Sequence, residues 1–178
     1  MSIYHEKQKW ELCALHALNN LFQDENAFSK QHLDELCQGL SPGSMVNPHR
    51  SMLGLGNYDV NVIMKAVQSK QCEAIWWDKR KSMKDLNFSN IRGFILNILS
   101  PLQFGFVSVP LRRKHWIAVR QVQGVYYNLD SKLSKPSEIG SAEDLRTFLE
   151  TKLKHKGCEL LLVVPSEAVE AGTWTLQT

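Results

Sequence analysis

Four side chains of this sequence have the types and the order that cysteine-dependent acyl transfer requires. Cys13 begins an apolar run, and Gln8 shortly precedes it. His115 and Asp130 lie far downstream. A thiol attacks well as the thiolate, which the positive end of a helix and a nearby imidazolium both stabilise. These residues predict a cysteine nucleophile with His115 as its base.

The base and a carboxylate that orients it are predicted to share one β-hairpin. Gln123-Gly124 separates two runs rich in β-branched and aromatic residues, which predicts antiparallel pairing of residues 115–121 with residues 125–130. If His115 begins one strand and Asp130 ends the next, the two side chains meet at one edge of the sheet. Asp130 would then accept a hydrogen bond from the imidazole and stabilise its charged form.

Gln8 is the candidate donor to the carbonyl oxygen under attack. Its side-chain amide, together with the backbone N–H of Cys13, would form the oxyanion hole. The predicted reaction is acyl transfer to cysteine followed by hydrolysis of the thioester. We expect it to need no metal and no other cofactor.

The elements that must position these groups follow a simple order, with helices first and strands afterwards. Apolar spacing predicts helices near residues 13–22, 29–40, 59–69 and 142–155. Short β-branched or aromatic runs predict strands at residues 74–77, 93–96, 116–119, 125–128 and 160–164. The expected fold is α+β: a helical subdomain carries Cys13, a mostly antiparallel sheet carries His115 and Asp130, and a cleft lies between them.

Length and composition favour one ordinary domain. A chain of 178 residues can bury roughly 70% of the surface that its unfolded form exposes. We expect a single catalytic domain over residues 1–165 and a loosely held tail over residues 166–178. The four cysteines are scattered, without C-x-x-C spacing or a signal-peptide pattern, which favours a reducing, cytoplasmic location and buried structural roles for Cys37, Cys72 and Cys158.

Charge and hydropathy limit the classes of partner that we expect for this chain. The net charge is +3, and the basic clusters at residues 79–81 and 112–114 lack the aromatic interleaving of a nucleic-acid platform, so we expect no nucleic acid. We interpret the clusters as solvated surface or as a contact for an acidic partner or an anionic membrane face, the last giving peripheral membrane association. No apolar run reaches the roughly 18–20 residues of a membrane span. We expect a monomer.

Other residues offer alternatives that the pattern alone leaves open. His16 shares a helix face with Cys13 and is a rival base, or half of a weaker metal-site candidate that lacks a second pair of ligands. Asn19 and Asn20 are expected to hydrogen-bond to neighbouring backbone. Trp76 and Trp77 alternate across a strand, so the outward one is a candidate binding anchor.

Several ordered motifs make this chain resemble the Josephin-domain deubiquitinases, most closely the short Josephin-only proteins. The motifs are His5-Glu6-Lys7-Gln8, Leu12-Cys13-Ala14, His16-Ala17-Leu18-Asn19-Asn20, Gly56-Asn57-Tyr58-Asp59-Val60-Asn61-Val62, His115-Trp116 and Asn128-Leu129-Asp130-Ser131. The resemblance covers about residues 3 to 165.

This resemblance implies a papain-like cysteine protease fold that hydrolyses isopeptide bonds at the C-terminus of ubiquitin. Gln8, Cys13, His115 and Asp130 fall on the family's functional positions. The resemblance also implies a mobile helical hairpin within residues 29–69 that gates the cleft and touches ubiquitin. Some members have Asn in place of Asp130, and the anionic residue here should favour the imidazolium.

The leading hypothesis is therefore a cysteine-type deubiquitinase whose partner is ubiquitin or ubiquitin chains. A second hypothesis is a weakly active ubiquitin-binding module whose catalytic set is held misaligned. A third, which rests on the triad alone, is a cysteine peptidase or amide hydrolase without ubiquitin specificity.

Overall fold

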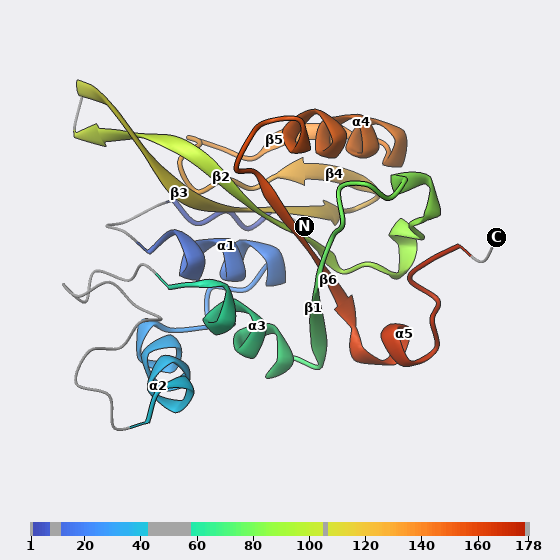
Figure 1. Cartoon of the computed structure of the whole chain (residues 1–178), viewed down its shortest axis with the longest axis horizontal. Helices are drawn as coiled ribbons and strands as arrows, with labels where there is room; N and C mark the ends of the chain where they lie inside the picture. Colours follow the sequence, from blue (N-terminus) through green and yellow to red (C-terminus); the bar gives the residue numbers. More distant parts are fainter. Residues whose placement is uncertain (1, 8–11, 43–57, 105–106, 177–178) are drawn as a thin grey trace.

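A six-stranded antiparallel sheet forms the centre of the molecule, with the strands in the order β1-β6-β2-β3-β4-β5 (Figure 1). The computed structural model describes residues 2–7, 12–42, 58–104 and 107–176. The helices are α1 (Cys13–Phe22), α2 (Lys30–Leu40), α3 (Val60–Gln68), α4 (Ala142–Leu153) and α5 (Ser166–Glu170), with 3₁₀ turns η1 (Met83–Asp85) and η2 (Phe88–Asn90). The strands are β1 (Cys72–Trp76), β2 (Gly93–Phe104), β3 (Val107–Val122), β4 (Val125–Asn128), β5 (Ser137–Gly140) and β6 (Glu159–Pro165).

Local signals in the sequence set the limits of most helices. The Ser29 hydroxyl accepts a hydrogen bond from the His32 N–H at the start of α2, and the Asp59 carboxylate caps α3 in the same way. Ser141 and Asp144 form a reciprocal capping box at the start of α4. The predicted helices therefore begin within a residue or two of their observed starts.

The core consists of two apolar clusters, one on each face of the sheet. Helices α1 and α3 lie on one face, with α2 packed against α3, and Ile95 of β2 packs with α1 there. Helix α4 contributes to the cluster on the other face, which Phe94 and Leu96 enter. This alternation follows from the two-residue repeat of a strand. Cys37, Cys72 and Cys158 are all buried in these clusters, as predicted.

Helix α1 lies very close to the sheet at Gly93. A Cβ atom added to this glycine would lie 2.6 Å from the Leu21 Cδ1 atom and 2.8 Å from the Val119 carbonyl oxygen. Both distances are shorter than a Cβ atom tolerates. The helix that begins with Cys13 can therefore lie this close to the sheet only because residue 93 has no side chain.

The predicted β3–β4 hairpin is confirmed. Val122 pairs with Val125, and the two turn residues between them, Gln123 and Gly124, both have positive φ. Two consecutive positive φ angles are typical of the tight turn that matches the twist of paired strands. The same register places Val119 opposite Asn128, two residues before Asp130.

The structure corrects the expectation of a loosely held tail from residue 166. Residues 166–170 form α5, the Asn87 N–H donates to the Trp174 carbonyl at 2.9 Å, and the Leu176 N–H donates to the Asp85 carbonyl at 2.7 Å. The partners are Asp85 of η1 and Asn87, which immediately precedes η2, and the sequence shows no hydropathy periodicity at these two short turns. Strand β5 and the long outer halves of β2 and β3 are likewise absent from the prediction.

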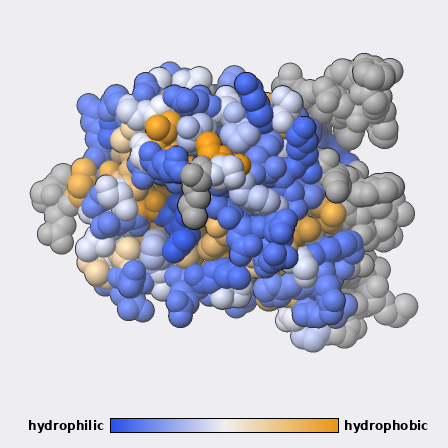
Figure 2. Space-filling view, turned by 180° about the vertical axis from the view of Figure 1, so that it is seen from behind, coloured by the Kyte–Doolittle hydropathy of each residue, from blue (hydrophilic) through white to orange (hydrophobic). Residues whose placement is uncertain are grey.

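The surface is consistent with a chain that buries its apolar residues internally. The face behind that of Figure 1 is mostly hydrophilic, with apolar areas that are small and separate (Figure 2). Among the described residues, the exposed large apolar side chains are Trp76, Leu99 and Leu176. No helix in the described ranges combines the length and the apolar character that crossing a bilayer requires.

Gly93→Ala should lower the free energy of unfolding by about 1–3 kcal/mol, because its methyl group must displace α1 or bend β3. Gly39→Ala is the matched control: it lies in α2, and an added Cβ meets nothing within 4 Å. This control should stabilise the protein by about 0.5–1 kcal/mol. Urea denaturation of both variants tests the contrast, and equal effects would contradict the close packing at Gly93.

Candidate active site

His115 and Asp130 form a short, buried hydrogen bond. The His115 Nε2 atom lies 2.6 Å from the Asp130 Oδ1 atom, and the His115 side chain is 3% exposed. The strand register brings them together, because the Leu129 N–H donates to the Ala118 carbonyl just beyond the paired part of β4. With Nε2 facing the carboxylate, Nδ1 is the ring nitrogen left for the nucleophile.

Cys13 completes a chain of three interacting side chains. Its thiol group lies close enough to His115 to contribute, together with Asp130, to the raised pKa of the imidazole. Burial of the ring lowers the pKa of His115, but the interactions with Asp130 and Cys13 outweigh it and raise this pKa above its usual value. The imidazole is therefore held ready to carry a positive charge beside the sulfur, which is the state that a thiolate nucleophile requires.

Asp130 remains ionised in its buried position. Burial alone raises the pKa of this carboxyl, but the hydrogen bond and charge of His115 outweigh burial and bring the pKa below its usual value. The Lys132 N–H also donates to Asp130 Oδ1 at 2.9 Å, and Lys132 adds a positive charge. An ionised Asp130 both orients the ring and stabilises its protonated form.

The first turn of α1 presents backbone N–H groups beside the nucleophile. The helix begins at Cys13, its N-cap position is Leu12, and no described side chain caps it. The positive end of the helix dipole therefore lies at Cys13, and the Cys13 N–H is suited to hold an oxyanion. Gln8, the predicted second donor, lies outside the described residues, so its role stays a prediction.

Asn20 connects the three segments that carry the site. This side chain is fully buried in α1 and donates to the Glu6 carbonyl at 3.2 Å and to the Leu129 carbonyl at 3.0 Å. The Glu6 N–H donates back to Asn20 Oδ1. One amide thus joins the nucleophile's helix to the N-terminal segment and to the backbone next to Asp130. The sequence predicts backbone hydrogen bonds for Asn20, but not this linking role.

His16, the rival base, is turned toward the N-terminal segment. Its Nδ1 atom lies 2.9 Å from the Glu6 Oε2 atom in a buried position. Burial raises the pKa of Glu6, yet its hydrogen bonds and charge contact with His16 and Asn19 bring the pKa below its usual value. His115 interacts with both Cys13 and Asp130, which favours it over His16 as the candidate base.

A groove of about 470 Å³ opens beside Cys13. Residues from the start of α3, from β1 and from the sheet line it, and they include Tyr58, Trp76, Asn97 and Trp116. As the alternation predicts, Trp77 is buried and Trp76 is 45% exposed. The sequence therefore locates an aromatic wall of this groove, but it gives no sign of Asn97.

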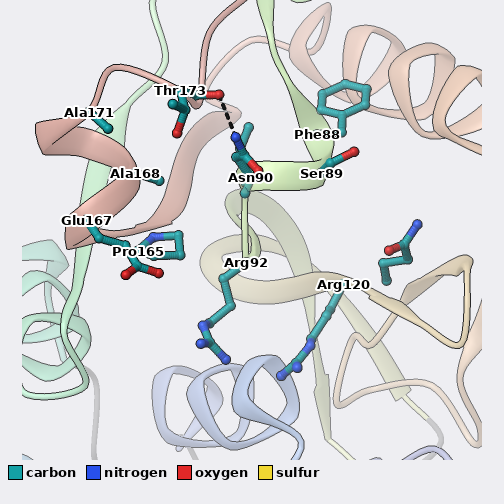
Figure 3. A pocket seen from close by; sticks show the side chains of 12 residues that line it. Phe88, Ser89, Asn90, Arg92, Arg120, Pro165, Glu167, Ala168, Ala171 and Thr173 are labelled. Atoms are coloured by element: carbon teal, nitrogen blue, oxygen red, sulfur yellow. Dashed lines mark hydrogen bonds between the residues drawn. The ribbon is translucent and has the colours of Figure 1, made fainter.

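A second hollow of about 570 Å³ lies against α5 and η2 and does not contain Cys13 (Figure 3). Its two arginines, Arg92 and Arg120, point toward α1 in this view. The Arg120 Nη1 group donates to the Leu21 carbonyl near the end of α1, and the Arg92 guanidinium lies 5.8 Å from the Phe22 ring. Cations at the negative end of a helix dipole are stabilising. These arginines therefore hold the far end of the nucleophile's helix.

Comparison with known proteins places this arrangement in a family. The Josephin family model matches residues 8–164. Josephin-2 of Mus musculus is 54% identical over 97% of this chain and 92% of its own length. The chain belongs to the Josephin family. A Josephin-like protein of Drosophila melanogaster is 49% identical over 93% of this chain and 75% of its own length. Ataxin-3 of Homo sapiens is 27% identical over 91% of this chain and 45% of its own length.

Membership in the Josephin family confirms the α+β, papain-like fold predicted from the sequence, with its helical subdomain packed on a mostly antiparallel sheet. In this Josephin chain the Tyr58 hydroxyl, two residues before α3, donates a hydrogen bond of 2.7 Å to the Asp34 carboxylate of α2. The Trp116 Nε1 group donates to the Tyr58 carbonyl at 3.2 Å. The helical hairpin is thus connected to the strand that carries His115.

Asp130→Asn should lower the pKa of His115, because the variant lacks the anionic partner. A raised pKa in the folded state contributes stability below about pH 6.5, and that stability is lost as the pH rises through the folded pKa. The wild type should therefore lose more stability than the variant between pH 6 and pH 9. An NMR titration of the His115 ring and urea midpoints at several pH values measure both effects.

Asp144→Asn is the control for this experiment, because Asp144 caps α4 and does not contact the triad. This variant should lose stability without changing its pH dependence above pH 6. An unchanged His115 titration in Asp130→Asn would contradict the assigned pairing.

Asn20→Ala should cost about 2–4 kcal/mol, because it leaves buried backbone groups at Glu6 and Leu129 without partners. Asn26→Ala is the exposed control and should change the free energy of unfolding by less than about 0.5 kcal/mol. Chemical denaturation compares the two, and faster proteolysis of the N-terminal segment should accompany the loss at Asn20. A small effect at Asn20 would argue against its linking role.

Proposed function

We propose that this protein is a cysteine-type deubiquitinase that hydrolyses isopeptide and peptide bonds at the C-terminus of ubiquitin. The observation that carries this proposal is the interacting series Cys13, His115 and Asp130, whose first member lines a groove. Membership in the Josephin family supports ubiquitin as the substrate.

The proposed chemistry uses Cys13 as the nucleophile and His115 as the group that holds and returns the proton. The Cys13 thiolate attacks the scissile carbonyl carbon while His115 holds the proton. The backbone N–H of Cys13, with Gln8 as the predicted second donor, stabilises the oxyanion. The C–N bond then breaks, and His115 gives its proton to the departing amine. In the second half, His115 takes a proton from water, which attacks the thioester and releases the free ubiquitin carboxylate and Cys13.

Burial of the nucleophile favours a gated reaction. The Cys13 side chain is 5% exposed, so a substrate must widen the groove before the carbonyl carbon reaches the sulfur. The start of α3 forms one wall of this groove, and Tyr58 couples that wall to α2 and to Trp116. We propose that ubiquitin contacts on the α2–α3 hairpin and on Trp76 supply the energy for this opening.

A ubiquitin derivative with a C-terminal thiol-reactive group tests the proposal directly. The wild type should form a covalent adduct at Cys13, Cys13→Ala should form none, and His115→Ala should react at least about 10³-fold more slowly. Cys158→Ala is the matched control, because this cysteine is buried away from the groove and should leave labelling unchanged. The absence of a wild-type adduct, or equal labelling of Cys13→Ala, would refute the assignment.

The burial of Cys13 also favours a second candidate function, a ubiquitin-binding module with little turnover. Titration of ubiquitin against Cys13→Ala, alongside wild-type turnover of a fluorogenic ubiquitin substrate, separates the two. Tight binding with negligible turnover would favour the module. Cleavage of short peptides as fast as the ubiquitin substrate would instead favour a general peptidase.

A further inference from the structure

Asn97 is a buried polar side chain in the floor of the groove beside Cys13. It is 4% exposed, and its Oδ1 atom accepts no hydrogen bond from the residues that the structure describes. An amide oxygen removed from water without a donor is destabilising, and most buried amide oxygens in folded proteins have one. An apolar residue of similar size would avoid this cost at the same position.

The strand register explains why Asn97 faces the groove. Asn97 of β2 lies opposite Trp116 on β3 and opposite Glu159 on β6. Two residues earlier in β2, Ile95 lies in the apolar cluster with α1. Because alternate residues of a strand share a face, Asn97 lies on the same face as Ile95, and it lines the groove together with Cys13.

The two residues that lie opposite Asn97 on the neighbouring strands make their hydrogen bonds with other groups. The Trp116 Nε1 group already donates to the Tyr58 carbonyl at 3.2 Å. The Glu159 carboxylate is itself an acceptor and takes a hydrogen bond from the Lys114 ammonium at 2.8 Å. Asn97 therefore brings an acceptor without a partner among the described residues to the lining of the groove that also contains Cys13.

We propose that Asn97 is a substrate-binding residue whose carboxamide oxygen accepts a backbone N–H from the acyl segment of ubiquitin, next to the scissile carbonyl. This inference rests on the proposed function. An extended peptide carries backbone N–H groups that need acceptors when they enter a groove, and Asn97 supplies one at the floor. The aromatic side chains of Trp76 and Trp116 border the same groove, which suits a chain with small side chains.

Asn97→Leu separates this role from a structural one. The substitution removes an unpaired buried acceptor, so the urea midpoint should stay the same or rise. The value of kcat/KM for ubiquitin with a C-terminal aminocoumarin should fall roughly 5- to 20-fold, the range expected for one lost hydrogen bond. Alkylation of Cys13 by iodoacetamide should keep its wild-type rate, because this reagent makes no backbone contact.

Asn90→Leu is the matched control at a distance from Cys13. Asn90 Nδ2 donates to the Thr173 carbonyl at 2.9 Å, beside the second hollow (Figure 3). This control should show the opposite result, with a lower urea midpoint and an unchanged kcat/KM. Asn97→Ala provides a second test that is free of the leucine bulk and should show a similar loss of kcat/KM.

Three other outcomes of these experiments would refute the inference. Wild-type kcat/KM in both Asn97 variants would refute substrate binding by Asn97 while leaving the deubiquitinase proposal intact. A loss seen with a lysine-linked substrate and not with the aminocoumarin would place the donor in the leaving group and refute the acyl-segment assignment. If the wild type does not cleave the ubiquitin substrate, the proposed function fails and this inference fails with it.

Discussion

The contact between Cys13 and His115 depends on how closely α1 lies against the sheet. The helix contributes Cys13, the proposed nucleophile, and the sheet contributes His115, the proposed base, so a small displacement of either element would separate them. Gly93 permits the close approach because a Cβ atom there would overlap Leu21 and the Val119 carbonyl. Arg120 holds the other end of the helix through the Leu21 carbonyl. Packing at Gly93 and at the Leu21 carbonyl, neither of which takes part in the proposed chemistry, thus fixes the position of Cys13.

Buried polar groups make this packing specific. Asn20 satisfies backbone groups of Glu6 and Leu129, and Glu6 lies close to His16. Each of these groups would be costly without its partner, so the N-terminal segment, α1 and the strand end that precedes Asp130 must come together in one arrangement. The electrostatics of the triad follow from the same burial, since a sparsely hydrated His115 depends on Asp130 for the stability of its charge.

Stability and function conflict at the groove. Cys13 and Asn97 are both buried, yet Asn97 retains an acceptor that the described residues do not satisfy, and Trp76 exposes an aromatic ring that could pack elsewhere. A chain optimised for folding alone would remove both features. Their location beside a nucleophile is the pattern expected where a ligand completes the interactions that the free protein lacks.

The sequence by itself determined what depends on neighbours along the chain. Helix caps such as Ser29 and Asp59, the apolar period of α1, the turn at Gln123-Gly124 and hence the proximity of His115 to Asp130 all follow from interactions within a few residues. The same local reasoning located Cys13 at a helix start and assigned Trp76 and Trp77 to opposite faces. The order of these motifs indicated the family.

Tertiary structure decided everything that depends on segments distant in the chain. It turned His16 toward Glu6 and brought His115 together with Cys13, although both histidines were candidates for the base from spacing alone. It ordered residues 173–176 against the η1 and η2 region, assigned Asn20 its linking role and left the buried Asn97 oxygen without a partner among the described residues. The physical reason is that burial and hydrogen-bond satisfaction depend on the whole set of packed neighbours, which no local pattern of residues specifies.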